Sequence, residues 1–339
     1  MAVPRVSIGV PVYNGENYVA HALDSLLNQT FQDLEIVISD NASTDRTEEI
    51  CRGYASCDPR IRYYRQAINR GAVWNHNCVF ELSRGEFFKW NSADDYCGPE
   101  FLERCVSALD ADPTAVMAVS EPVEVDEQCR PLAVGTVPTH TLLPAVPENA
   151  PTHVRFRQNI RLDHMCLTIY SLIRSDVLGK VGPMGSYTDS DRILLAHLSL
   201  FGHCVVIPGA LLFNRDHAGR FSRSYNRFYD GWRERATWMD PSNAKRWVFP
   251  FWTELFELVR TVHRTPLPLS QRFRCYNEIF RWLGYETHLR RLYIDATHYP
   301  RKWVVRHFPK AKVFWNWLWG RRNAGANVGS TASDHKVSS

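Results

Sequence analysis

Apolar residues in the first 110 positions alternate between the two-residue period of a strand and the three- to four-residue period of a helix. Short β-branched or aromatic runs predict strands at 6–12, 34–39, 61–65 and 86–91. Helical spacing predicts helices at 19–27, after the capping-box pair Asp45 and Glu48, from Gly71 to Leu82, and from about Pro99. Strands that alternate with helices imply a parallel sheet with right-handed crossovers.

The chain after residue 111 has a less regular pattern. It predicts strands at 115–125, 166–173, 205–207 and 210–214, and a helix at 189–201. The proline-rich stretch 127–151 predicts a long loop, and residues from about 224 to 319 are helical in pattern and rich in aromatics. We therefore expect an α/β fold, a mostly parallel sheet flanked by helices, with an aromatic-rich α-helical extension. The Gly-, Ser- and Asn-rich tail after Arg322 predicts disorder.

Composition narrows the class of protein. The 339 residues are 45% hydrophobic and 22% charged, as in ordinary globular proteins, and a formal charge of +4 is too small to indicate nucleic acid as a partner. None of the nine cysteines forms a C-x-x-C pair, which favours reduced thiols over a zinc site or a disulfide framework. The N-terminus reads as a strand instead of a signal peptide, and no apolar run is long enough for a spanning helix. We expect a cytoplasmic protein.

Polar residues follow the end of each of the first four predicted strands. They are Pro11, Tyr13 and Asn14; Asp40 and Asn41; Asn69 and Arg70; and Asp94 and Asp95. Ligands of open parallel sheets bind beyond the carboxyl ends of the strands, so these residues should share one edge. The G-x-G-x-x-G fingerprint is absent, which weakens a dinucleotide interpretation. The adjacent carboxylates of Asp94 and Asp95 repel each other, and a bound cation would explain their pairing.

Three segments of the chain resemble the family 2 glycosyltransferases, inverting GT-A enzymes that use nucleotide-sugar donors. These segments are VSIGVPVYNGENYVAHALDSLLNQTFQDLEIVISDNASTDRT, NRGAVWNHNCVFELSRGEFFKWNSADD and SDRILLAHLSLFGHCVVIPGALLFNRDH. The resemblance covers about residues 4–217 and implies a Rossmann-like GT-A domain over 1–220. Residues 1–110 would bind the nucleotide sugar and 111–220 the acceptor, with a helical region at 221–322 and a tail at 323–339.

The resemblance implies a donor site with a divalent metal, Mn²⁺ or Mg²⁺. Asp94 matches the metal-binding end of the family's D-x-D motif, while Ser92 stands where the first aspartate would be. Asp95 could bind metal or contact sugar hydroxyls, and Asp94 could instead cap the helix near Pro99. Asp40 would recognise the nucleobase, uracil in many members, unless it only forms an Asx turn. The other expected donor contacts are Pro11, Tyr13, Asn14, Glu16, Asn41 and Arg70.

Two later motifs supply the remaining chemistry that the resemblance implies. The family's E-D pair at a helix start corresponds to Ser190-Asp191, so Asp191 is the candidate general base, with Asp189 as an alternative. Both could instead be first-turn acids favoured by the helix dipole. The family's R-x-H corresponds to Arg215 and His217, which implies diphosphate binding by Arg215 and metal or phosphate binding by His217.

The C-terminal third has Trp, Tyr and Phe among Arg and Lys. This composition suits a helical bundle on the catalytic domain, or a face for peripheral contact with the inner face of a membrane. We expect a nucleotide-sugar donor, most simply UDP-linked, and a saccharide, lipid-linked or other hydroxyl acceptor. Two alternatives stay open: a catalytically silent nucleotide-sugar-binding protein, which Ser92 and Ser190 favour, and a sugar-1-phosphate nucleotidyltransferase, which the lack of a Gly-rich basic loop after the first strand disfavours.

Overall fold

A computed structural model describes the chain except for residues 1–2, 133–145, 148, 161–165, 221–228 and 308–339. The chain forms two compact units, Met1–Tyr285 and Glu286–Ser339. Helix α12 (Glu286–His307) is the described part of the second unit. The predicted disordered tail and part of the predicted loop 127–151 lie outside the described residues. The predicted functional division at residue 220 stays a prediction.

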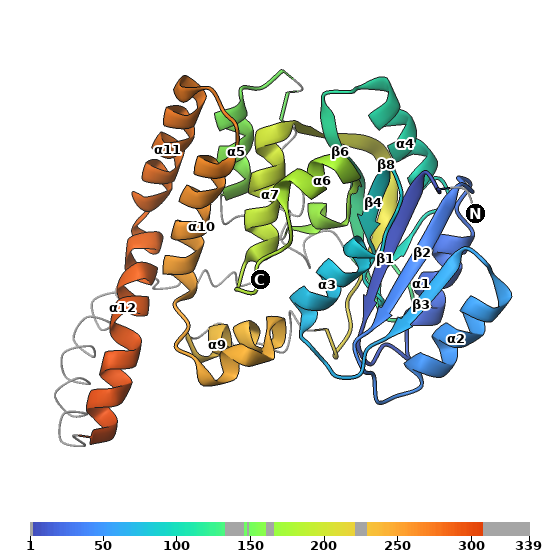
Figure 1. Cartoon of the computed structure of the whole chain (residues 1–339), viewed down its shortest axis with the longest axis horizontal. Helices are drawn as coiled ribbons and strands as arrows, with labels where there is room; N and C mark the ends of the chain where they lie inside the picture. The colour runs from blue at the N-terminus through green and yellow to red at the C-terminus, as the bar shows by residue number, and fades with distance from the viewer. Residues whose placement is uncertain (1–2, 133–145, 148, 161–165, 221–228, 308–339) are drawn as a thin grey trace, which may run out of the picture. The chain divides into compact units, whose positions relative to one another are not determined.

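The first unit is built on one sheet of mixed but mainly parallel strands (Figure 1). Its strand order is β3-β2-β1-β4-β7-β6-β8-β5. The strands are β1 (Val6–Val12), β2 (Leu34–Asp40), β3 (Ile61–Arg65), β4 (Phe87–Trp90), β5 (Tyr96–Cys97), β6 (Ala115–Val125), β7 (Leu172–Arg174) and β8 (His203–Arg215). β1 to β4 are mutually parallel, as are β6 and β8, while β5 and β7 run antiparallel to their neighbours. The sequence-based expectation of a mostly parallel α/β sheet is confirmed.

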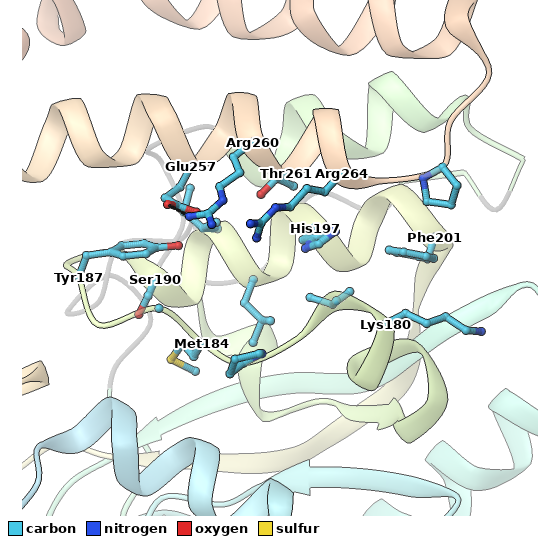
Figure 2. A pocket seen from close by; sticks show the side chains of 16 residues that line it. Lys180, Met184, Tyr187, Ser190, His197, Phe201, Glu257, Arg260, Thr261 and Arg264 are labelled. Atoms are coloured by element: carbon cyan, nitrogen blue, oxygen red, sulfur yellow. Dashed lines mark hydrogen bonds and ion pairs between the residues drawn. The ribbon is translucent and has the colours of Figure 1, made fainter.

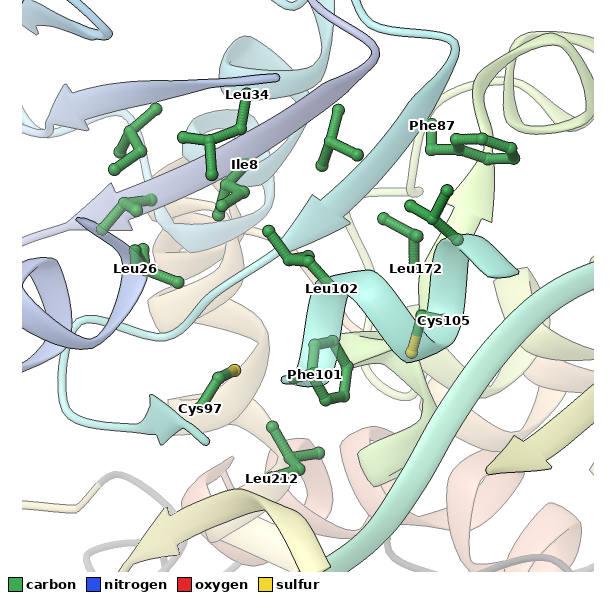
Figure 3. Packing of buried hydrophobic residues seen from close by; sticks show 14 of the residues in the cluster. Ile8, Leu26, Leu34, Phe87, Cys97, Phe101, Leu102, Cys105, Leu172 and Leu212 are labelled. Carbon is green, nitrogen blue, oxygen red and sulfur yellow. The ribbon is translucent and has the colours of Figure 1, made fainter. Parts of the chain in front are cut away.

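Helices cover both faces of the sheet, which is why the central strands are apolar on both sides. One face packs against α1 (Val19–Leu27), α2 (Thr47–Cys57) and α4 (Phe101–Ala111) (Figure 3). The other face packs against α3 (Ala72–Glu81), α6 (Ser175–Val181) and α7 (Ser190–Phe201). Gly9 allows α3 to approach closely, because a Cβ there would lie 2.6 Å from a Val79 methyl carbon.

A third apolar cluster packs two helices from the end of the first unit against the rest of that unit. Side chains of α5 (Thr152–Ile160) and α7 pack against α10 (Pro250–Arg264) and α11 (Leu269–Leu283). Helix α9 (Tyr229–Met239) and the 3₁₀ helix η2 (Pro241–Lys245) precede α10. A helical region was therefore correctly expected here. No helix among the described residues is both long and apolar enough to cross a bilayer.

Several local predictions were wrong. Residues 166–173 are not one strand: the backbone of Cys166 is left-handed, with φ of 56°, and starts the 3₁₀ helix η1 (Leu167–Tyr170) before β7. The strands predicted at 205–207 and 210–214 are one strand, β8, whose pairing with β6 shifts register between them. The predicted capping box does not form: Arg46 is the N-cap of α2, the Asp45 carboxylate accepts from the Thr47 N–H, and Glu48 pairs with Arg52. Helices α5 and α6 were not predicted.

Candidate active site

The two aspartates that follow β4, here called the acidic tip, lie at the carboxyl edge of the sheet. Asp94 Oδ2 is 2.9 Å from His217 Nε2, and the Ser92 hydroxyl donates a hydrogen bond to Asp94 Oδ1. Helix α4 begins only at Phe101, after β5, so Asp94 does not cap it. The structure therefore brings together Asp94 and His217, which are 123 residues apart in the sequence.

Asp95 is held by protein groups other than those that contact Asp94. One carboxylate oxygen accepts from the Arg215 backbone N–H at 2.8 Å and the other from the Asn214 amide at 3.1 Å. Burial, and next the charge of Asp94, raise the pKa of Asp95. Burial works in the same direction on Asp94, but hydrogen bonds from His217 and Ser92 outweigh it and hold the pKa of Asp94 below its usual value. Asp94 is thus the aspartate that stays charged.

Arg215 is buried directly behind the acidic tip. Its guanidinium donates to the Asp94 carbonyl at 3.0 Å and to the Glu127 carbonyl at 2.9 Å, and lies 3.0 Å from His21 Nδ1. It also lies over the ring of Tyr18, 4.9 Å from the centroid. In this arrangement Arg215 fixes the backbone of Asp94, and the expected contact of Arg215 with a diphosphate stays a prediction.

Lys89 supports the acidic tip from inside the sheet. Its side chain is fully buried, and its ammonium donates to the Trp90 carbonyl at 2.9 Å and to Asn91 Oδ1 at 3.1 Å. The Asn91 amide donates in turn to the carbonyls of Ser92 and Asp95. A buried cation is tolerated only when its hydrogen bonds are satisfied, so this chain of contacts fixes the turn that carries both carboxylates.

The donor set of the acidic tip fits part of a metal site. Two adjacent ligands of an octahedral ion at about 2.1 Å would lie about 3.0 Å apart, and Asp94 Oδ2 and His217 Nε2 are separated by 2.9 Å. Among the described residues, however, no group of three or more His, Cys, Asp and Glu side chains could hold a metal ion. The protein could supply two ligands, and a divalent ion bound here would need further oxygen ligands from elsewhere.

The loops after β1 and β2 are joined by reciprocal hydrogen bonds. The Asn14 side chain accepts from the Thr44 N–H at 2.8 Å, and Glu16 accepts from the Arg46 N–H at 3.1 Å. Asn14 has a left-handed backbone, with φ of 52°. Asn14 and Glu16, which were predicted to contact the nucleotide sugar, therefore hold the loop after β2 in this structure. Tyr13, by contrast, is 48% exposed at the end of β1 and Pro11 is partly exposed.

Asp40 and Asn41 both organise the neighbouring strand and loop. The fully buried Asp40 carboxylate accepts from Tyr63 at 2.8 Å and from Arg65 at 3.0 Å. A nucleobase that hydrogen-bonds to Asp40, as predicted, would share the carboxylate with these two side chains. The Asn41 side chain accepts from the Arg70 N–H at 2.9 Å. The Arg70 guanidinium is exposed and lies over the Trp74 ring, 4.1 Å from its centroid.

Asp191 lies in the first turn of α7, partly exposed, and its carboxylate accepts from the Arg192 N–H at 2.9 Å. Asp189 precedes the helix with a left-handed backbone, φ 59°, and pairs with Arg235 at 3.3 Å. Asp191 is near His76 of α3: burial lowers the pKa of His76, and the charge of Asp191 partly opposes that change. The His76 carbonyl accepts from the Trp90 indole at 2.9 Å, which joins α3 to the end of β4.

Sequence reasoning missed three residues around the acidic tip. Tyr18 packs on His217 with ring centroids 4.7 Å apart, and His21 contacts Arg215 one helical turn further along α1. The spacing of three between these two aromatic side chains, just after the P-x-Y-N turn, was the available indication. Lys89 was visible as a lysine inside an otherwise apolar strand.

Comparison with known proteins gives the following similarities. The family model for glycosyl transferase family 2 matches residues 7–179, just over half of the 339 residues. An uncharacterized glycosyltransferase of Rickettsia typhi is 37% identical over 106 residues, 31% of this chain and 32% of that protein. Chondroitin synthase of Escherichia coli is 36% identical over 110 residues, 32% of this chain and 16% of that protein. The chain matches a third or less of the length of these relatives.

Solved structures show the same fold at low sequence identity. S. aureus TarS 1-349 in complex with UDP-GlcNAc has a TM-score of 0.58 and 16% identity, covering 83% of this chain and 73% of TarS 1-349. The mannosyltransferase PcManGT from Pyrobaculum calidifontis, in complex with GDP-Man and Mn²⁺, has a TM-score of 0.52 and 16% identity, covering 94% of this chain and 80% of PcManGT. The expected GT-A fold is confirmed.

Proposed function

We propose, for a chain that belongs to glycosyl transferase family 2, that it transfers a sugar from a nucleoside diphosphate sugar to an acceptor hydroxyl with inversion at the anomeric carbon. The observation that carries this proposal is the pairing of Asp94 with His217 at the edge of the sheet where the polar strand ends meet. A charged carboxylate and an imidazole in that position suit a site for a metal-bound diphosphate.

The donor is proposed to be UDP-linked, with the base and ribose over the ends of β1 and β2. TarS is described with UDP-GlcNAc and PcManGT with GDP-Man, which supports a nucleotide sugar and leaves a GDP-linked donor as the alternative. Tyr13 and Arg70 are exposed and able to contact a ligand directly. We also propose donor contacts for five further residues: Pro11, Asn14, Glu16, Asp40 and Asn41. The side chains of Asn14 and Glu16 also hold the loop after β2.

The proposed metal ligands are Asp94 and His217. A bound Mn²⁺ or Mg²⁺ would neutralise negative charge that develops on the leaving diphosphate. Ser92 orients the Asp94 carboxylate through its hydroxyl, and Arg215 fixes the Asp94 carbonyl. Asp95, whose oxygens are held by Asn214 and Arg215, would contribute as a buried support of the tip or through contact with donor hydroxyls.

Asp191 is the proposed general base. In an inverting transfer, the acceptor hydroxyl attacks from the face opposite the nucleotide and must lose its proton to a positioned group. Asp191 is partly exposed and belongs to a helix that packs on the sheet, which would keep its carboxylate at a fixed place. Asp189 is already paired with Arg235 and is the weaker candidate.

A thermal-shift screen of nucleotide sugars with and without Mn²⁺, followed by transfer of radiolabelled sugar, tests the proposal. A donor that binds the native state raises the melting temperature. We expect a shift for a UDP-sugar that Mn²⁺ enlarges, and that Asp94→Asn reduces. No shift with any nucleotide sugar, or turnover unaffected by chelator, would contradict the proposed site.

A catalytically silent nucleotide-sugar-binding protein is the second candidate. It is favoured by Ser190, a buried serine where the family has an acid, and by Ser92 in the D-x-D position. The same two assays separate the candidates. A UDP-sugar that stabilises the protein, with neither hydrolysis nor transfer for any acceptor tried, would favour the silent protein.

We also propose peripheral contact with the inner face of a membrane through α10 and α11, which would suit a lipid-linked acceptor. Phe256, Phe273 and Phe280 are 62%, 71% and 73% exposed, and Arg274 and Arg281 lie beside the last two on α11. Aromatic and cationic side chains together suit an anionic interface. Cosedimentation with phosphatidylglycerol vesicles should exceed that with phosphatidylcholine vesicles, and Phe273→Ser should reduce it. Equal sedimentation with both would contradict the contact.

A further inference from the structure

A cavity of about 330 Å³ lies between α7 and α10, closed on a third side by residues 180–187 (Figure 2). This volume is within the usual range for small-molecule sites, about 300–1,000 Å³. The cavity is separate from the acidic tip, none of whose residues lines it. We call it the basic pocket, for the charges described next.

The lining of the basic pocket has more positive than negative side chains. Lys180, Arg260 and Arg264 line it, against the single carboxylate of Glu257. Glu257 is already paired with Arg260 at 3.0 Å, and Lys180 is paired with Asp176, which is not part of the lining. Arg264 has no ion pair among the described residues. The pocket therefore has a guanidinium that an anion could neutralise.

Two polar groups deeper in the pocket add hydrogen-bonding capacity. Ser190 is 1% exposed, and its hydroxyl has no hydrogen-bond partner in the structure. A buried hydroxyl without a partner destabilises the native protein, and a polar ligand bound to it would remove that cost. His197 lies opposite Arg264 (Figure 2). Burial, with a further contribution from Arg264, lowers the pKa of His197 to about 4, so its neutral ring offers one N–H donor.

The lining of the pocket includes Ser190, the residue before the proposed general base, and continues along α7 to Phe201. Ser190, at one end of the lining, precedes Asp191 in the chain, and His197 lies two helical turns further on. At 1.5 Å per residue, Ser190 and His197 are about 10 Å apart along the helix axis. A ligand with an acidic group near Arg264 that reaches past Ser190 would have its other end at the first turn of α7, the turn that carries Asp191.

We propose that the basic pocket binds an acidic part of the acceptor: a saccharide carrying a phosphate or carboxylate about 10 Å from the hydroxyl that receives the sugar. Arg264 would pair with the anion, with Lys180 and His197 beside it, and Ser190 would bind a hydroxyl or oxygen nearer the base. This assignment rests on the proposed transferase function. It adds to that function a preference for acidic saccharides as acceptors over neutral saccharides.

Isothermal titration of the full-length chain with glucose 6-phosphate, glucuronic acid and glucose tests the pocket directly. We expect the two acidic sugars to bind more tightly than glucose, and their ratio to show whether phosphate or carboxylate is preferred. Arg264→Gln should weaken acidic-sugar binding about tenfold or more, the usual worth of a hydrogen bond to a charged group. Arg157→Gln, an exposed arginine of α5 outside the lining, is the matched control and should bind like the unaltered protein.

Two further outcomes keep the pocket and the function distinguishable. Equal binding of acidic and neutral sugars, or unchanged binding in Arg264→Gln, would overturn the proposed role of the basic pocket. It would do so even if a UDP-sugar still raised the melting temperature. Acidic-sugar binding that depends on Arg264, in a protein that binds no nucleotide sugar, would overturn the acceptor assignment together with the proposed function. Circular dichroism of each variant checks that the fold is retained.

Discussion

The acidic tip and the basic pocket are built in opposite ways. Every carboxylate oxygen of Asp94 and Asp95 has a protein partner, and Lys89 holds the turn from a fully buried position. In the basic pocket, Arg264 is exposed without an ion pair among the described residues, and the Ser190 hydroxyl has no partner. A preorganised site suits one small ion in fixed geometry, whereas an open cationic site suits a larger and more variable ligand.

The largest expected effect concerns Asp191, which lies in the first turn of α7, next in the chain to Ser190 of the basic pocket. Asp191→Asn should reduce transfer about 10²–10⁴-fold, the usual worth of a positioned base, while donor binding by thermal shift is retained. Asp189→Asn is the matched control and should be much more active. If Asp189→Asn is the inactive variant and Asp191→Asn the active one, Asp189 is the base. If Asp191→Asn is as active as the unaltered protein, Asp191 is not the base.

Removing the His217 imidazole that contacts the acidic tip should change the metal dependence of sugar transfer. His217→Gln should raise the Mn²⁺ concentration that gives half-maximal turnover by more than the about ten- to hundredfold that loss of an outer-shell partner costs, because one of the two proposed protein ligands is lost. Tyr18→Phe, which keeps the ring that packs on His217, should leave that concentration nearly unchanged. An unaltered Mn²⁺ titration in His217→Gln would show that the imidazole only orients Asp94.

The same substitution in the two regions should have unequal effects on stability. Lys89→Met leaves the Trp90 carbonyl and Asn91 Oδ1 without their donor inside the sheet and should lower the free energy of unfolding by about 1–3 kcal/mol. Lys180→Met replaces a side chain that is 61% exposed and should change it by less than about 0.5 kcal/mol. Urea unfolding measures both, and equal values would contradict the contrast between the regions.

The smallest effect expected is on the pH dependence of stability through the basic pocket. Because the pKa of His197 is lowered to about 4, the unfolded chain binds a proton that the native protein does not between about pH 4 and 6.5, and stability falls as pH drops through that range. His197→Gln should remove about 1–2 kcal/mol of the difference between unfolding free energies at pH 7 and pH 5. His263→Gln, which replaces an exposed histidine of α10, is the control. Identical pH dependence in both variants would contradict a neutral buried His197.

The predicted fold was most accurate where a local pattern is supported by burial on both faces. Strands β1 and β2 match the predicted runs, β2 to within one residue, because nearly all of their residues are buried. Prediction failed at 166–173, where an apolar run is buried without being a strand, because burial alone does not distinguish a 3₁₀ turn from a strand. It also failed for α5 and α6, whose short helices lack a strong periodic pattern.

The sequence by itself determined the acidic tip, since Asp94 and Asp95 are adjacent and follow a strand whose end must lie at the ligand edge of a parallel sheet. Only the tertiary structure decided that Asp94 pairs with His217, that Asp95 turns toward Asn214, and that Arg264 comes to lie opposite His197. The physical reason is range. A strand and the turn after it are specified by neighbouring residues, whereas a charge pair or a pocket depends on how distant elements pack, and periodicity carries no information about which side chains then meet.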